Sequence, residues 1–267
     1  MRFARFALPV VAMLAASGAA FALDTSPLPP KHPGWSFEGP FGHYDRAALQ
    51  RGFQVYKEVC SACHSLNRVA FHDLSSDNGG SGFFTDPQVK ALAAGYQIDA
   101  DPNDKGEIFD DKGNRLKRPG IPADHFPPPF ANENAARAAN GGAVPPDLSL
   151  IVKARAGGAD YVYSIVTGDG SPVPHGFKVQ EGKYYDPYFS GRNISMPPPL
   201  SANQVTYSDG TKATVDQEAH DVATFLSWTA EPKMEERKHL GFEVMLFLIG
   251  LSLLLYLSYR RVWRDVH

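Results

Sequence analysis

Two cysteines and a histidine stand together near residue 60, and they are the side chains of this sequence best suited to hold a reactive group. The order Cys60-Ser61-Ala62-Cys63-His64 is the C-x-x-C-H pattern of covalent haem attachment. Two thiols three residues apart can each add to one vinyl group of the same porphyrin, and the next residue then holds its imidazole within reach of the iron. We therefore expect one covalently bound haem c, attached through Cys60 and Cys63, with His64 as an axial ligand.

The sequence contains no cysteine besides these two. This excludes a disulfide-rich scaffold, a four-cysteine zinc site and a cysteine-ligated iron–sulfur cluster. Two other interpretations of the pair stay open. A thiol–disulfide enzyme would need β-α-β alternation around the pair, and the sequence lacks it. A zinc site would need a second pair of good ligands, but His72, His125, His175 and His220 are not paired at a spacing of three to five residues.

Haem iron also needs a sixth ligand or an open position. Methionine is a common partner of histidine because its soft thioether favours Fe(II). Beyond the first 22 residues the methionines are Met196, Met234 and Met245. Only Met196 lies away from the C-terminal apolar stretch, and the three prolines after it stiffen its segment. We expect Met196 as the second axial ligand, with His125 or His175 as the alternatives. With both axial positions filled, the iron would move electrons and not bind substrate.

Composition narrows the class of protein further. The chain has 267 residues, 26 basic and 29 acidic side chains and a formal net charge of -3, which does not suit a nucleic-acid binder. Aromatic residues at 12% and charged residues at 21% argue against a mainly disordered chain. We find no acid–base or nucleophile constellation, so we expect no catalytic site in this chain itself.

Both ends of the chain have features of membrane targeting. Residues 1–22 combine early positive charge, a short apolar run and a small-x-small site, as a cleaved secretory signal does. Residues 240–259 carry one charge and, at about 1.5 Å per residue, are long enough to cross a bilayer. Arginines in residues 260–267 mark the cytoplasmic side. We expect a periplasmic haem domain over residues 23–239 and a single-pass anchor in a bacterial inner membrane, with the C-terminus cytoplasmic.

The expected haem domain reads as short helices joined by long loops. Asp45 can cap the first helix, and Thr214 with Gln217 forms a capping box for the last. The expected helices cover residues 45–60, 85–94, 132–140, 147–155, 160–167 and 214–229. Strand-like alternation is scarce. Such helices bury little by themselves, so a haem at the centre of the domain would complete the core.

Several segments resemble the cytochrome c1 family. The resemblance covers nearly the whole chain after the signal, in the same order. The matching segments are Arg51-Gly52-Phe53-Gln54-Val55-Tyr56, Cys60 to Ser65, Pro145-Pro146-Asp147-Leu148-Ser149, Lys153-Ala154-Arg155, Asp160-Tyr161-Val162, Met196-Pro197-Pro198-Pro199, Asp221 to Leu226 and Ala230-Glu231-Pro232-Lys233.

The family resemblance implies a mainly α fold: a class I cytochrome-c-like haem domain with long loops, plus one C-terminal transmembrane helix. It implies the same haem ligands that are expected above, and it places Arg155 and Tyr161 near the haem edge or its propionates. A propionate that is partly buried does need a cation or hydrogen-bond donors.

The resemblance also implies partners. The family's protein is the haem c subunit of the ubiquinol–cytochrome c oxidoreductase (cytochrome bc1) complex, beside cytochrome b. Electrons would come from a Rieske iron–sulfur protein and pass to a soluble c-type cytochrome, so catalysis would belong to the assembly. Residues 23–239 contain 21 basic and 27 acidic side chains, and this excess of acid suits a basic acceptor. The alternatives are a membrane-anchored c-type cytochrome that serves another oxidase or reductase, and an exported thiol–disulfide oxidoreductase.

Overall fold

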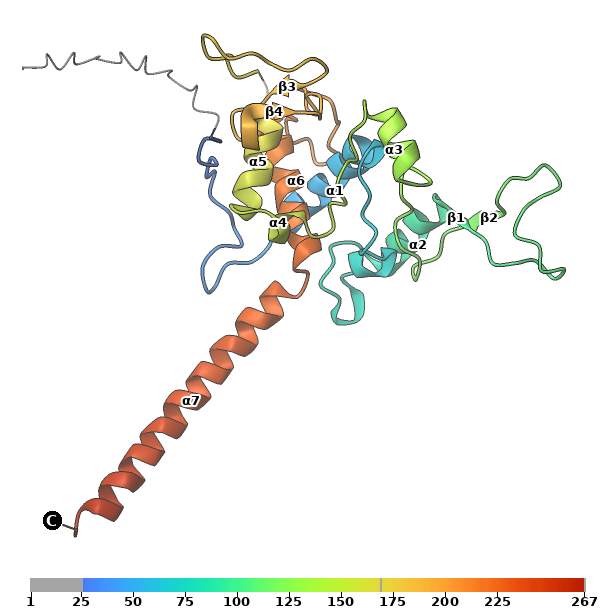
Figure 1. Ribbon diagram of the computed structural model, residues 1–267. Coiled ribbons are helices and arrows are strands. Elements are labelled where there is room, and N and C mark those ends of the chain that lie inside the picture. The colour runs from blue at the N-terminus through green and yellow to red at the C-terminus, as the bar shows by residue number, and fades with distance from the viewer. Residues whose placement is uncertain (1–25, 169, 267) are drawn as a thin grey trace, which may run out of the picture.

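The computed structural model describes residues 26–168 and 170–266, and within them the chain is mainly helical, as expected (Figure 1). The predicted signal over residues 1–22 lies outside the described residues. The α-helices are α1 (Arg46–Glu58), α2 (Asp86–Ala94), α3 (Glu133–Ala139), α4 (Ile151–Ala154), α5 (Gly158–Thr167), α6 (Val215–Ala230) and α7 (Met234–Trp263). Four 3-10 turns are η1 (Cys60–Ala62), η2 (Phe71–Leu74), η3 (Asp77–Gly79) and η4 (Ser190–Arg192).

Helices α1 and α6 cross at the centre of the domain. Their backbones approach so closely at Gly52 that a Cβ there would lie 2.0 Å from the carbonyl oxygen of Asp221. Only glycine fits such a crossing. This contact fixes α1 relative to α6. It therefore also fixes the position of the C-x-x-C-H turn, which follows α1.

Aromatic side chains fill the core around this crossing. Phe53 of α1 and Phe225 of α6 meet at ring centroids 5.7 Å apart, and Phe83 stands edge-on to Trp228 at 5.1 Å. Phe126, 3% exposed, closes the cluster from the loop before α3. Edge-to-face aromatic pairs of this kind stabilise a core by about 0.5–1.5 kcal/mol each beyond their buried area. The base of the C-x-x-C-H turn is thus built on a rigid cluster.

Side chains cap the starts of three of these helices. The carboxylate of Asp45 accepts from the backbone N–H groups of Ala47 at 2.9 Å and Ala48 at 3.4 Å, and α1 begins next to it. At α2, the backbone N–H of Thr85 donates to the side chain of Gln88 at 2.8 Å. Asn132 caps α3. Apart from the helix expected over 147–155, the observed helices match the expected ranges to within a few residues.

Two local expectations were wrong. The helix expected over 147–155 begins only at Ile151, because the carboxylate of Asp147 accepts hydrogen bonds from residues 65 and 67 instead of capping a helix at that point. At α6, Thr214 accepts from the backbone N–H of Gln217 at 3.1 Å, as a cap does. The side chain of Gln217 does not complete the capping box, however, since it donates forward to Asp221 at 3.0 Å.

Two small hairpins leave the helical body. Strands β1 (Gln97–Asp99) and β2 (Lys117–Pro119) pair antiparallel, with Gln97 opposite Pro119. The charged loop between them projects away from the domain (Figure 1). Strands β3 (Tyr184–Tyr185) and β4 (Asn193–Ile194) also pair antiparallel, directly before the expected methionine ligand.

A single long helix, α7, leaves the domain at its C-terminal end (Figure 1). Among the described residues it is the one helix long and apolar enough to cross a membrane, and its most apolar 18-residue window is 0% buried. The helix has 30 residues and begins at Met234, six residues before the predicted span of 240–259. Its first two turns carry charged side chains that contact the domain: Glu235 accepts from Arg46, and Lys238 donates to the carbonyl oxygen of Phe37.

Candidate haem-binding site

The C-x-x-C-H residues form a tight turn at the end of α1. The helix ends at Glu58, and the carbonyl oxygen of Cys60 then accepts from the N–H of Cys63 at 3.1 Å and from that of His64 at 2.9 Å. Cys60 packs partly against the core, whereas Cys63 is exposed. Because one carbonyl closes the turn twice, both thiols and the imidazole are held within a single loop of backbone.

The imidazole of His64 is oriented by a distant loop. Its Nδ1 lies 2.8 Å from the carbonyl oxygen of Pro146. A carbonyl can only accept, so Nδ1 carries the proton and Nε2 keeps a free lone pair. Burial lowers the pKa of His64, which favours the neutral ring. A neutral imidazole with one nitrogen tied to a backbone carbonyl is the usual state of a histidine that binds a metal.

Asp147 fastens this loop to the turn, a role that the sequence did not reveal. Its carboxylate accepts from the hydroxyl of Ser65 at 2.8 Å, the N–H of Asn67 at 2.8 Å and the N–H of Ser149 at 2.9 Å. These bonds lower its pKa against the opposing effect of burial. The two residues on either side of the Pro146–Asp147 peptide bond therefore hold His64 and its successor. The Pro145-Pro146 pair signalled rigidity, but nothing in the sequence indicated the contact with residue 64.

The electrostatics of Cys60 do not suit a thiol–disulfide enzyme. Burial, with a smaller contribution from Cys63, raises the pKa of the Cys60 thiol to about 12. An attacking thiol in such enzymes needs a lowered pKa, because the thiolate is the nucleophile. A protonated, half-buried thiol beside an oriented imidazole fits covalent haem attachment better than disulfide exchange.

Met196 lies at a bend two residues after β4, within residues 195–200, which we call the strap, and it is half buried. Both ends of the strap are held: Lys183 is hydrogen bonded to Ser195, and Leu200 packs against the core. Further on, the buried carboxylate of Glu218 accepts from the N–H of Val205 at 3.4 Å. The thioether therefore sits on a stiff segment, although its assignment as the sixth ligand stays a prediction.

Arg155 and Tyr161 come together between α4 and α5. Burial raises the pKa of the Tyr161 hydroxyl, and the positive charge of the nearby Arg155 guanidinium acts in the opposite direction. Arg155 is exposed and also donates to the carbonyl oxygen of Ala154 at 3.2 Å. A guanidinium and a phenol side by side can bind a carboxylate, which is the chemistry a propionate requires.

The alternative ligands have a different setting. His125 and His175 are both exposed, and His125 pairs through its backbone with Ala70. Within residues 26–168 and 170–266, no group of three or more histidine, cysteine, aspartate or glutamate side chains could hold a metal ion. A zinc site at the cysteine pair therefore gains no further ligands from the described part of the chain.

The residues present fit a covalently attached haem. Two free thiols stand at the C-x-x-C spacing, and an imidazole next to them keeps Nε2 available while its other nitrogen is engaged. The donor set, one imidazole nitrogen with two thiols, matches this group and no other that the sequence left open.

Comparison with known proteins agrees with this geometry. Residues 35–266 match the cytochrome C1 family. The chain is 48% identical to cytochrome c1 of Rhodospirillum rubrum, over 87% of this chain and 86% of that protein. It is 48% identical to the mitochondrial cytochrome c1 heme protein of Saccharomyces cerevisiae, over 82% and 67%. Identity to cytochrome b/c1 of Bradyrhizobium diazoefficiens is 49% over 97% of this chain, which spans only 40% of that relative's length. The chain thus belongs to the cytochrome c1 family.

Proposed function

We propose that this protein is an electron-transfer subunit that carries one covalent haem c in a quinol–cytochrome c reductase (cytochrome bc1) complex. One observation carries the proposal: the imidazole of His64, beside two free thiols, is fixed through Nδ1 by the carbonyl oxygen of Pro146. Membership of the cytochrome c1 family supports it, since relatives are named cytochrome c1 heme proteins.

Each expected site residue then has a role. Cys60 and Cys63 would form the two thioether bonds, and His64 and Met196 would be the axial ligands. When bound, haem supplies one-electron chemistry between Fe(II) and Fe(III). The chain's own contribution is to fix the imidazole, to keep it neutral and to hold the thioether on a stiff strap. A rigid ligand set changes little between oxidation states, and this favours rapid electron transfer.

Arg155 and Tyr161 would serve a haem propionate. Arg155 follows α4 and Tyr161 lies on α5, so the two side chains offer a guanidinium and a hydroxyl from neighbouring elements. Charge-assisted hydrogen bonds to a carboxylate are shorter and about twice as strong as neutral ones. We infer that this pair helps to set the orientation of the haem edge, without taking part in any proton transfer.

The proposed placement follows from the two ends of the chain. Residues 1–22 would be removed as a signal peptide, and residues 23–239 would form the haem domain in the periplasm of a bacterium. Residues 240–259, within α7, would cross the inner membrane, leaving residues 260–267 in the cytoplasm. The exposed apolar face of α7 and the arginines at its end support this orientation.

The proposed partners follow from the family. Cytochrome b would lie beside α7 in the membrane. A Rieske iron–sulfur protein would reduce the haem, and a soluble c-type cytochrome would oxidise it. The chain would not catalyse a reaction alone, because quinol oxidation would belong to another subunit of the assembly.

A haem spectrum together with co-purification tests this function. Membranes with an affinity-tagged full chain should give a pyridine haemochrome spectrum of haem c, with one haem per chain, and a b-type cytochrome should be retained. Replacing Cys63 by serine should leave a single thioether and shift the spectrum. Free, alkylatable thiols without haem would establish the thiol–disulfide alternative. Haem c with a different oxidase or reductase in place of the b-type cytochrome would establish the other alternative.

A further inference from the structure

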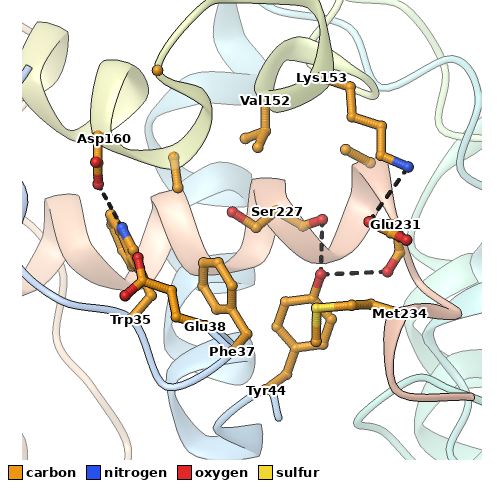
Figure 2. Close-up of a pocket in the computed structure, with 13 residues that line it drawn as sticks. Trp35, Phe37, Glu38, Tyr44, Val152, Lys153, Asp160, Ser227, Glu231 and Met234 are labelled. Atoms are coloured by element: carbon orange, nitrogen blue, oxygen red, sulfur yellow. Dashed lines mark hydrogen bonds and ion pairs between the residues drawn. The ribbon is translucent and has the colours of Figure 1, made fainter. Parts of the chain in front are cut away.

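A cavity of about 230 Å³ lies away from the haem-binding turn, where the haem domain meets α7. Its walls come from four parts of the chain: the segment 35–44, α4, the start of α5 and the α6–α7 junction (Figure 2). The function proposed above does not use this cavity. The side chains that line the cavity determine which ligands it could bind.

Aromatic rings form one wall. Trp35 stacks on Phe37 with ring centroids 5.4 Å apart, and Phe37 lies 5.2 Å from Tyr44. Figure 2 shows the three rings together, opposite Val152 and Lys153 on α4. The indole of Trp35 is stacked between Phe37 and His220, whose ring centroid lies 4.8 Å away. Phe37 and Tyr44 are therefore the rings that can offer a π face to an alkylammonium cation.

Carboxylates add negative charge to the same cavity. Glu38, Asp160 and Glu231 line it, against one cation, Lys153. Asp160 accepts from the indole N–H of Trp35 at 2.6 Å, which fixes both side chains. Glu38 lies 3.5 Å from Nε2 of His32, a contact that becomes an ion pair only when the imidazole is protonated.

These carboxylates differ in how many cations and hydrogen-bond donors already balance their negative charge. Glu231 has two cationic neighbours, Lys153 and Arg237. Asp160 is met by Trp35 and by Nδ1 of His32, which lies 2.9 Å away. The hydrogen bond to Asp160, together with the charges of Asp160 and Glu38, raises the pKa of His32. The imidazole lies closer to Asp160, at 2.9 Å, than to Oε2 of Glu38, at 3.5 Å. Glu38 therefore has the most distant cationic partner of the three carboxylates and can best accept from a further cation.

With residues 240–259 placed in the membrane, as proposed above, the cavity lies at the level of the membrane surface. Met234, the first residue of α7, lines it, and the apolar part of α7 starts six residues later at Leu240. At 1.5 Å per residue this separation is about 9 Å, close to the roughly 5–8 Å depth of the headgroup layer on one side of a bilayer. A headgroup beside α7 is therefore at the height of the cavity.

A loop of the same wall points toward the lipid. Phe41, 77% exposed, touches Phe242 of α7 with ring centroids 5.9 Å apart. Lys238 holds this loop on α7 through the carbonyl oxygens of Phe37 at 2.7 Å and Gly42 at 3.0 Å. An exposed aromatic at the start of an apolar helix is typical of a residue that enters the membrane interface.

We propose that this cavity binds the ethanolammonium end of a phosphatidylethanolamine molecule in the leaflet next to the haem domain. The ammonium lies against Phe37 and Tyr44 and donates to Glu38, while the lipid phosphate faces Lys153. A primary ammonium suits the site better than choline, because it can donate hydrogen bonds to a carboxylate. The acyl chains lie along α7, beside Phe41.

Lipid retention by the full-length holoprotein tests the proposal. Purified in detergent, the protein is incubated with equal amounts of phosphatidylethanolamine and phosphatidylglycerol, and native mass spectrometry counts the lipid bound per haem. We expect phosphatidylethanolamine to be retained preferentially. Glu38→Gln should reduce that preference by about fivefold or more, the scale of a lost desolvated ammonium contact. Glu181→Gln, on an exposed loop, is the matched control and should behave as wild type.

A second variant and a competition experiment distinguish the lipid from other ligands. Phe37→Leu retains volume but removes a ring, and it should also lower the preference while the haem spectrum stays normal. Free ethanolamine at the same concentration should not displace the lipid; displacement would mean that a soluble amine is the ligand and would overturn the lipid assignment. Equal retention of both lipids by wild type and by Glu38→Gln would overturn the site itself, as would a preference for phosphatidylglycerol.

Discussion

The guanidinium of Arg51 on α1 holds the carboxylate of Asp221 on α6 through two hydrogen bonds, from Nε at 2.8 Å and from Nη2 at 3.0 Å. The side chain of Asp221 is fully buried, and that of Arg51 is 15% exposed. Arg51 also reaches Asp209 at 2.9 Å. The pair lies next to Gly52, at the α1–α6 crossing that positions the C-x-x-C-H turn.

Removing the cation should therefore destabilise the whole domain. Arg51→Leu would leave a buried carboxylate without its cation, a loss of about 3–5 kcal/mol in the free energy of unfolding. Thermal unfolding of the full-length holoprotein in detergent, followed by circular dichroism, measures it. The control is Arg115→Leu, which breaks an exposed pair with Asp99 and should cost under about 1 kcal/mol. Equal effects of the two substitutions would contradict the importance of the crossing.

The loop that orients His64 gives a second prediction. Asp147→Asn keeps the size of the side chain but weakens three hydrogen bonds to charged oxygens, a loss of about 1–3 kcal/mol. We expect lower thermal stability and less haem attached per chain, read from the haemochrome spectrum relative to total protein. Asp101→Asn, on the exposed β1–β2 loop, is a control for the general effect of removing an aspartate. An unchanged haem content would show that attachment does not need the loop.

Capping and periodicity predicted a helix well where the capping side chain bonds to the helix that directly follows it. Asp45, Thr85 and Thr214 each precede a helix within a few residues, so a local pattern contains the information. Asp147 has the same residue type, but its hydrogen bonds reach back about 80 residues to Ser65 and Asn67. A single sequence does not encode such a contact in any local spacing.

The same limit applies to the candidate site. The spacing of Cys60, Cys63 and His64 indicated haem directly, because attachment chemistry fixes it. The partner of the imidazole, Pro146, could not be predicted, since a backbone carbonyl has no signature in a sequence. The cavity at the membrane surface was missed for a related reason. Its walls, among them Trp35 and Met234, are joined only when α6 and α7 bring distant segments together.

The assignment of Met196 leads to a third prediction. Met196→Leu preserves the size of the side chain but removes the thioether, so the reduction potential should fall and the low-spin methionine-type spectrum should be lost. Redox titration and optical spectra of the full-length protein measure both. Met245→Leu, on the exposed face of α7, is the matched control and should change neither. Retention of the methionine-type spectrum in Met196→Leu would show that another residue is the ligand.

The projecting loop between β1 and β2 allows a fourth prediction. Oδ1 of Asp110 accepts from the N–H groups of Lys112 and Asn114 and so stabilises the turn at residues 110–114. Asp104 and Asp111 are also in this loop, and both are exposed. If this loop meets a basic acceptor, electron transfer should slow as ionic strength rises, because salt screens exposed charges. The double variant Asp104→Asn, Asp111→Asn should show a weaker salt dependence. Stopped-flow oxidation by a basic cytochrome measures the rates, and a flat dependence in wild type would remove the electrostatic docking argument.

Glu218 on α6 gives the last prediction. Its side chain is fully buried, and Oε2 has no hydrogen-bond partner among the described residues, while Oε1 accepts from the N–H of Val205 at 3.4 Å. Burial raises the pKa of this carboxyl, and the hydrogen bond from the backbone N–H of Val205 opposes that effect only in part. The charged form is therefore less stable in the folded protein than in the unfolded chain.

The sign of the pH dependence follows from this raised pKa. Below the ordinary glutamate pKa both states are protonated, and Glu218 has no effect on stability. As the pH rises, the unfolded chain loses its proton first, so the folded state is progressively disfavoured until the raised pKa is passed. Glu218→Gln removes the ionisation and should raise stability at pH 7 by on the order of 1 kcal/mol, with little effect near pH 4. Thermal unfolding at both pH values, with the exposed Glu133→Gln as control, measures the difference. A variant that is less stable than wild type at pH 7 would mean that the carboxylate is compensated in the fold and anchors the strap after Met196 as a charge.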